Sequence, residues 1–156
     1  MTGTRLEAIA IPTAPGVFHA KEWGVTWGQP EIDELKTVAL GVPARRARLC
    51  LHPSKEAIHQ EMLIVVHKDA VEVPQRRSNG PHTKIALEGT ANLELYSNDG
   101  SLLRVLGLGG KGSRYFRTID RSFHRLVSVT EWFVFIEILR GPFVVSTTER
   151  AAWFHE

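Results

Sequence analysis

Short segments in which apolar and polar residues alternate occupy most of the chain after residue 45. Ala47, Leu49 and Leu51 alternate with polar side chains, a period of two that is typical of a half-buried strand. Similar segments recur down the chain, separated by turn residues such as Asn98-Asp99-Gly100. The pattern predicts a mainly β protein, a sandwich, jelly roll or small barrel, with strands over 47–51, 62–67, 70–73, 91–96, 102–108, 115–119, 124–129 and 132–139.

One helix is predicted, over residues 30–40. Pro30 suits its first turn, apolar residues recur on one face, and Gly41 is a natural end. Residues 1–29 show no clear period, so we expect an extended arm with a short strand, which packs through its tryptophans on the body or on a neighbouring subunit. The expected parts are an arm and helix over 1–44, a β-barrel over 45–145 and a C-terminal tail over 146–156.

The composition is that of one globular domain. The chain has 156 residues, of which 43% are hydrophobic and 23% charged, and a net charge of +2 that is too small to indicate nucleic-acid binding. A single cysteine, Cys50, excludes an intrachain disulfide and suits a reducing compartment. No secretory leader or long apolar stretch is present, so we expect a cytoplasmic protein without a membrane or nucleic-acid partner.

The run from Pro74 to His82, followed by Gly89 and by the distant His124, is the part of the chain where a site is expected. Between residues 45 and 143 the chain resembles a cupin, most specifically the WbuC-type cupin family. The resemblance rests on the order and spacing of landmarks, namely Arg45-Arg46-Ala47-Arg48-Leu49-Cys50-Leu51-His52, Val73-Pro74, Gly89, Asn98-Asp99-Gly100, Phe123-His124 and Glu137-Ile138-Leu139-Arg140-Gly141-Pro142-Phe143. It implies a cupin-type double-stranded β-helix, or jelly-roll barrel, and a role connected with surface-polysaccharide or sugar metabolism.

The resemblance also implies where metal ligands would lie, and this chain departs from the pattern. The family's first motif is Pro-His-x-His, then a Glu, then a Gly; counting back from Gly89 places Gln75 and Arg77 at the two His positions. His82 stands at the Glu position, and His124 keeps the His of the second motif. Asp120 and Arg121 replace the small turn residues expected before it.

Two chemistries remain open for these residues. In the first, His82, His124 and Gln75 hold one divalent ion (Fe, Ni, Mn or Zn) in a metal-dependent enzyme, although the cationic Arg77 cannot ligate a metal. In the second, no metal is bound, and Arg77 clamps a small anionic or sugar-like ligand, with Lys84 on the same face and Phe123 beside it. We favour this second hypothesis on local chemistry.

A structural role is the third alternative. His82 and His124 would then be hydrogen-bonded barrel residues, and Arg77 would pair with a nearby carboxylate such as Glu72. Side chains would fill the barrel, and the N-terminal arm over residues 1–29 would carry assembly. The cupin resemblance further implies a homo-oligomer, most simply a homodimer.

No catalytic residue is identified by spacing. His52, His59 and His67 show no ligand pattern, and Cys50, without a histidine partner in view, is expected to be inert.

Overall fold

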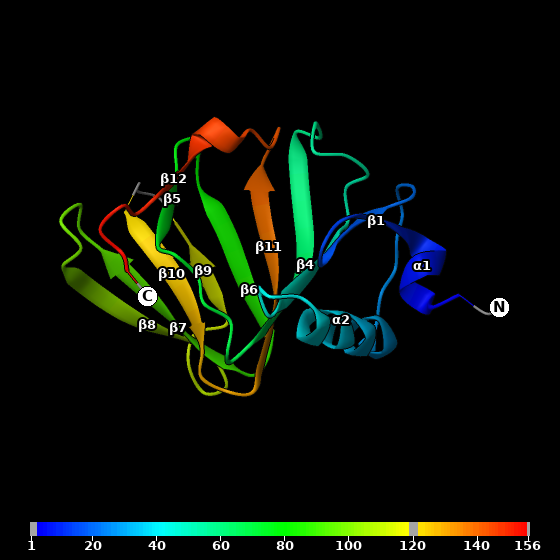
Figure 1. The fold of residues 1–156 in the computed structure, drawn as a ribbon, viewed down its shortest axis with the longest axis horizontal. Helices are drawn as coiled ribbons and strands as arrows, with labels where there is room; N and C mark the ends of the chain where they lie inside the picture. Colours follow the sequence, from blue (N-terminus) through cyan, green and yellow to red (C-terminus); the bar gives the residue numbers. More distant parts are fainter. Residues whose placement is uncertain (1–2, 119–121, 156) are drawn as a thin grey trace.

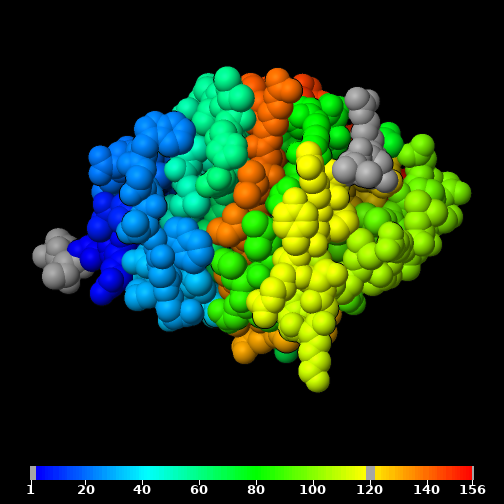
Figure 2. All heavy atoms as spheres, turned by 180° about the vertical axis from the view of Figure 1, so that it is seen from behind, coloured from blue at the N-terminus to red at the C-terminus, as the bar shows by residue number. Residues whose placement is uncertain are grey.

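The computed structural model describes residues 3–118 and 122–155, and within them two β-sheets face each other, with helices on the outer side of one sheet (Figure 1). The larger sheet has seven strands in the order β1-β2-β3-β4-β11-β6-β9, and all its pairs are antiparallel except β2 with β3. Their bounds are β1 (Ala10–Ala14), β2 (Val17–Ala20), β3 (Arg46–Cys50), β4 (His59–His67), β6 (His82–Glu88), β9 (Tyr115–Arg117) and β11 (Trp132–Arg140). Figure 2 shows β11 as an orange band between the β4 and β6 segments.

The smaller sheet has five strands in the order β12-β5-β10-β7-β8. It consists of β5 (Gln75–Arg77), β7 (Thr90–Tyr96), β8 (Leu102–Gly109), β10 (Phe123–Ser128) and β12 (Thr148–Arg150), the last preceded by a 3₁₀ turn, η1 (Val145–Thr147). Gln75 on β5 pairs with His124 on β10. The two halves of the sequence motif, which are distant along the chain, therefore lie side by side.

The space between the sheets is filled by the inward positions of the alternating strands. On β11 these positions include Phe133 and Phe135, whose rings stack with centroids 5.3 Å apart. Ala86 on β6 and Leu126 on β10 belong to the same buried cluster. Burying each large apolar side chain stabilises the fold by about 1.5–3 kcal/mol, so this core fixes which face of the strands that contribute to it points inward.

A second core covers the outer face of the larger sheet. Helix α2 (Gln29–Gly41) packs Leu35 and Ala39 against Leu49 of β3 and Val65 of β4. Helix α1 (Arg5–Ile9) is attached to α2 by backbone N–H donation to the Glu34 carboxylate, at 2.7 and 3.0 Å. The N-terminal segment is thus folded onto the body of its own chain. No helix among the described residues is long and apolar enough to cross a bilayer.

The predicted fold class is confirmed, and most predicted elements are present. The helix expected over 30–40 is α2, but a second helix, α1, lies in the segment expected to be extended. The strand predicted over 70–73 is wrong, because that segment forms no strand and leads into β5 instead. The alternation of apolar and polar residues also did not predict strands β5 and β6. The strand expected over 115–119 ends at Arg117 in the structure. Ile119, Asp120 and Arg121 lie outside the described residues.

Gly89, the landmark of the sequence motif, is required by a close approach of two strands. Its φ of +74° lies in the left-handed region, and a Cβ at this position would come within 2.0 Å of the Trp132 carbonyl oxygen. Only glycine tolerates both conditions. The turn at Gly89 carries the chain from β6 in the larger sheet directly into β7 in the smaller sheet.

Candidate ligand site in the barrel

The inward face of the barrel carries a buried polar group near one end of β6 and β11. Lys84 lies directly opposite Glu137 in the strand register, and His82 lies opposite Leu139. Because side chains alternate along a strand, His82 and Lys84 share the inward face with Ala86, while Glu137 shares it with Phe135. The side chains of His82, Lys84 and Glu137 are only 5%, 7% and 15% exposed.

These three residues form one hydrogen-bonded group. Lys84 Nζ donates to Glu137 Oε1, which also lies 3.0 Å from His82 Nδ1. The same Nδ1 is 3.2 Å from Lys84 Nζ, so it either donates to Glu137 or accepts from Lys84, because a lysine only donates. Burial alone raises the pKa of the Glu137 carboxyl, but Lys84 and the bond from His82 hold it well below its usual range. Glu137 is therefore a buried carboxylate.

His124 faces this group from the other sheet. The ring centroids of His82 and His124 are 4.8 Å apart, and His124 Nδ1 lies 3.2 Å from the Ser122 carbonyl oxygen. That carbonyl can only accept, so Nδ1–H donates and Nε2 carries the lone pair. Burial, followed by the positive charge of Lys84, lowers the pKa of His124 to about 3, and the same two causes lower that of His82. Both imidazoles are neutral at neutral pH.

Arg77 has part of its guanidinium buried without a partner. Its Nε donates to Asn79 Oδ1 at 3.3 Å, and its Cζ lies 5.7 Å from the centre of the Phe143 ring. Nη2 is buried and has no hydrogen-bond acceptor among the described residues. Burial lowers the pKa of Arg77, while Glu137 acts in the opposite direction. A guanidinium remains charged in proteins, so an N–H group of a cation is left unsatisfied here.

A cavity of about 310 Å³ adjoins Arg77 at the end of β5. Its lining is rich in hydroxyl and charged groups, and consists of Arg76, Arg77, Ser78, Ser146, Thr147 and Glu149. Hydroxyl groups can both donate and accept hydrogen bonds. The cavity is thus a polar space beside the residue with the unsatisfied donor.

The donor set around His82 and His124 does not fit a divalent cation. Lys84 Nζ lies against His82 Nδ1, and the Gln75 amide nitrogen donates to Glu72 at 3.3 Å. Within the described residues, the ligand atoms of His82, His124 and Glu137 do not converge within 4.8 Å of one another. A metal ion at this place would be repelled by Lys84 and Arg77, and it would find two neutral imidazoles as its main ligands.

The structure separates the other predicted site residues from this group. Phe123 precedes the inward His124 and packs instead under Arg76, whose Cζ is 4.4 Å from the ring centre, and against Trp153. The Glu72 carboxylate contacts Arg46 and Gln75 and accepts from the Leu126 N–H. Lys84, by contrast, contacts both His82 and Glu137, and the charge of Arg77 acts on the pKa of His82.

Glu137 was missed by sequence reasoning, although the sequence contained a signal for it. It is a single charged residue in the otherwise apolar strand from Trp132 to Leu139, at the same parity as Phe133 and Phe135. An acidic residue at an inward position costs free energy unless it is paired. That position therefore predicts a buried cation opposite, which is Lys84.

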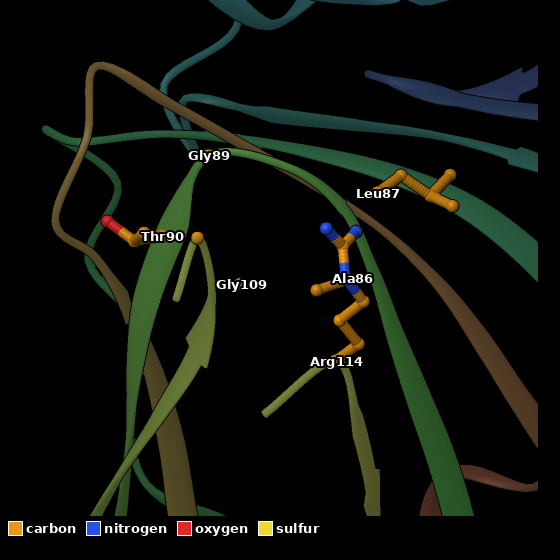
Figure 3. Close-up of a pocket in the computed structure, with 7 residues that line it drawn as sticks. Ala86, Leu87, Gly89, Thr90, Gly109 and Arg114 are labelled. Carbon is orange, nitrogen blue, oxygen red and sulfur yellow. The ribbon is translucent and has the colours of Figure 1, made fainter. Parts of the chain in front are cut away.

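A second cavity, of about 250 Å³, lies at the turn between β6 and β7 (Figure 3). Small residues and backbone line most of it, including Gly89, Gly109 and Thr90, and Arg114 supplies the charged group. Gly109 cannot be replaced by a larger residue without strain, because a Cβ there would lie 2.1 Å from the Gly89 carbonyl oxygen. Close packing of turns accounts for these glycines, so this cavity carries less chemistry than the barrel group.

The two facing sheets form a jelly-roll barrel, and its fold is of the cupin type. Solved structures with this fold include CapF in complex with 3-isopropenyl-tropolone, with a TM-score of 0.58 and 11% identity over 70% of this chain and 32% of that one. A Shewanella oneidensis protein aligns with a TM-score of 0.52 and 11% identity, over 61% of this chain and 63% of that one.

Bacillus subtilis oxalate decarboxylase, a protein with Mn(II) centres, aligns over 60% of this chain and 24% of its own, at 16% identity and a TM-score of 0.47. The chain spans less than two thirds of each of these proteins, and at such identities the likeness concerns the fold alone. No family model matches the chain, and no curated protein matches it in sequence.

Proposed function

We propose that this cupin-type barrel binds a small anionic ligand through Arg77. The observation that carries the proposal is the buried Nη2 of Arg77, which lacks an acceptor among the described residues. An unsatisfied buried donor costs about 1–3 kcal/mol, and more when the group is charged. A carboxylate or phosphate oxygen would remove that cost and form a charge-assisted hydrogen bond.

The charge balance of the barrel supports an anion. Lys84 and Arg77 contribute two positive charges, Glu137 contributes one negative charge, and the two histidines are neutral. Arg48 adds a further positive influence on Arg77. An excess of positive charge in a region of low dielectric attracts an anion and disfavours a metal cation.

The polar lining indicates the kind of ligand. Ser78, Ser146 and Thr147 place hydroxyl groups around the cavity next to Arg77. A ligand that combines one carboxylate or phosphate with hydroxyl groups, such as a sugar acid or a sugar phosphate, would use both the guanidinium and these side chains. The closer relationship to WbuC-type cupins belongs to this proposal, and it rests on the order of the sequence landmarks.

Calorimetric titration with inorganic phosphate and with malonate tests the proposal. We expect saturable binding to the wild-type protein, and a loss of at least about tenfold in affinity in Arg77→Gln, the equivalent of 1.4 kcal/mol. Arg104→Gln is the matched control, because Arg104 is exposed on β8 and does not line the cavity. Equal affinity of the wild-type protein and Arg77→Gln for both anions would refute the proposal, as would binding lost equally in both variants.

A further inference from the structure

A second group of ligand-type side chains lies on β2 and β3, away from the barrel motif. These strands are parallel, with His19 in register with Cys50. Cys50 and His52 are two residues apart, so their side chains point to the same face of the extended chain. The chain between them stays paired with β4, because the Leu51 N–H donates to the Glu61 carbonyl oxygen at 2.8 Å. The pairing of β2 with β3 thus brings His19 next to Cys50 and to His52, which follows the end of β3, although His19 is distant from both in the sequence.

The ligand atoms of these residues converge. One ring nitrogen of His19, one of His52 and Sγ of Cys50 all lie within 4.8 Å of one another. The two rings meet edge to face, with centroids 5.5 Å apart. Cys50 and His52 are each 3% exposed, whereas His19 is half-buried, so solvent approaches the group from the β2 side.

Neighbouring groups orient both imidazoles. His19 Nδ1 lies 2.8 Å from the Thr13 hydroxyl, which in turn contacts the Val17 carbonyl oxygen. His52 Nδ1 lies 3.2 Å from the backbone carbonyl and N–H of Glu61. With each Nδ1 engaged, each ring has Nε2 left to ligate. Histidine ligands in metal sites commonly have such a partner on their other nitrogen.

We propose that His19, Cys50 and His52 bind a divalent transition-metal ion of the zinc type. One thiolate and two imidazoles form a nitrogen and sulfur donor set that suits zinc. Three protein ligands leave a fourth position of a tetrahedral ion for a water molecule on the side of His19. This set shares no residue with the barrel group of His82 and His124, so the proposal stands apart from the proposed anion site.

The surrounding charges are compatible with a cation after the thiol loses its proton. Burial raises the pKa of the Cys50 thiol to about 11, and a bound metal displaces that proton. Arg48 lies on the same face, and its positive charge disfavours a cation there. Glu56 acts on His19 and Glu61 on His52 with a negative charge, which favours a cation. The thiolate and these carboxylates offset the charge that the ion and Arg48 bring.

Titration with Co²⁺ as a spectroscopic probe tests the proposal, followed by competition between Zn²⁺ and a chromophoric chelator. We expect one ion per chain, a thiolate-to-cobalt charge-transfer band, and displacement of Co²⁺ by Zn²⁺. Cys50→Ser should abolish the band and weaken binding by more than about 100-fold, since losing even an outer partner of a ligand costs about 10–100-fold. Thr13→Val, which removes only such a partner, should weaken binding by about tenfold.

Two controls make the result decisive. His155→Asn alters an exposed histidine far from the group in the sequence, and the double variant His82→Gln/His124→Gln removes both barrel imidazoles. Both should retain the band and the affinity. His19→Asn, at the half-buried position, gives a second ligand variant if Cys50→Ser fails to fold. The absence of a charge-transfer band in the wild-type protein, or its loss in the barrel double variant, would overturn the proposal.

Discussion

The buried neutral His124 should make the protein lose stability in acid. Its pKa is lowered from 6.5 to about 3 in the folded chain, first by burial and then by Lys84. As the pH falls through 6.5, the unfolded chain takes up the proton and the folded chain does not, so the stabilisation present above 6.5 is lost progressively towards pH 3. At 1.36 kcal/mol per pKa unit, His124 alone lowers the free energy of unfolding by about 2 kcal/mol between pH 7 and pH 5.

Urea unfolding, followed by tryptophan fluorescence at pH 7 and pH 5, measures this effect. His124→Gln keeps a hydrogen-bonding side chain but cannot titrate, so its loss of stability between the two pH values should be about 2 kcal/mol smaller than that of the wild-type protein. His82 remains in both proteins and contributes in the same direction. His155→Gln, at an exposed position, is the control and should behave as the wild-type protein. The same pH dependence in His124→Gln as in the wild-type protein would refute the buried neutral state of His124.

Three further predictions concern the charge pair, the motif turn and assembly. Glu137→Gln leaves Lys84 and Arg77 without their buried anion, and should lower the free energy of unfolding by about 3–5 kcal/mol in urea titration; a change below 1 kcal/mol would contradict the pairing. Gly89→Ala should destabilise the fold by at least about 2 kcal/mol, because Cβ meets the Trp132 carbonyl, whereas Gly107→Ala, with open space around it, should not; equal thermal shifts would argue against this. Strand β8 is a sheet edge with Leu102 and Leu103 exposed, so the expected homodimer should use it, and Leu103→Lys should give monomer in sedimentation; an unchanged dimer would exclude this edge.

The alternation of apolar and polar residues was enough to predict a mainly β fold, and the resemblance to cupins narrowed it to a jelly-roll barrel. The period of two in residues 47–51 and 91–96 marks strands that bury one face, the first against the helices and the second inside the barrel. Gly89 was placed by the spacing of the cupin motif, and the structure supplies the physical reason, because the turn there admits only glycine. A strand was wrongly predicted over residues 70–73 because β-branched residues favour strands on average. Whether a strand forms also depends on tertiary contacts with a partner strand, and residues 70–73 pair with none.

The chemistry of the barrel was less visible in the sequence, because its groups meet only through the strand register. Arg77 was singled out by the resemblance to the cupin motif, and Lys84 by its even spacing from His82. Glu137 comes from a strand 53 residues beyond Lys84, and only the pairing of β6 with β11 places it opposite. The same holds for Cys50, which was expected to be inert: His19 reaches it by the parallel pairing of β2 with β3, and no spacing rule connects those residues.

What occupies the barrel beside Arg77 decides between an anion site and a metal site. A crystal structure of the protein grown with malonate or phosphate, with anomalous data collected for transition metals, would show what lies beside Arg77 and between His82 and His124. We expect an anion oxygen within hydrogen-bond distance of Arg77 Nη2, the buried donor without an acceptor among the described residues. An anomalous peak for a metal ion ligated by His82 and His124, with Arg77 turned away, would contradict it.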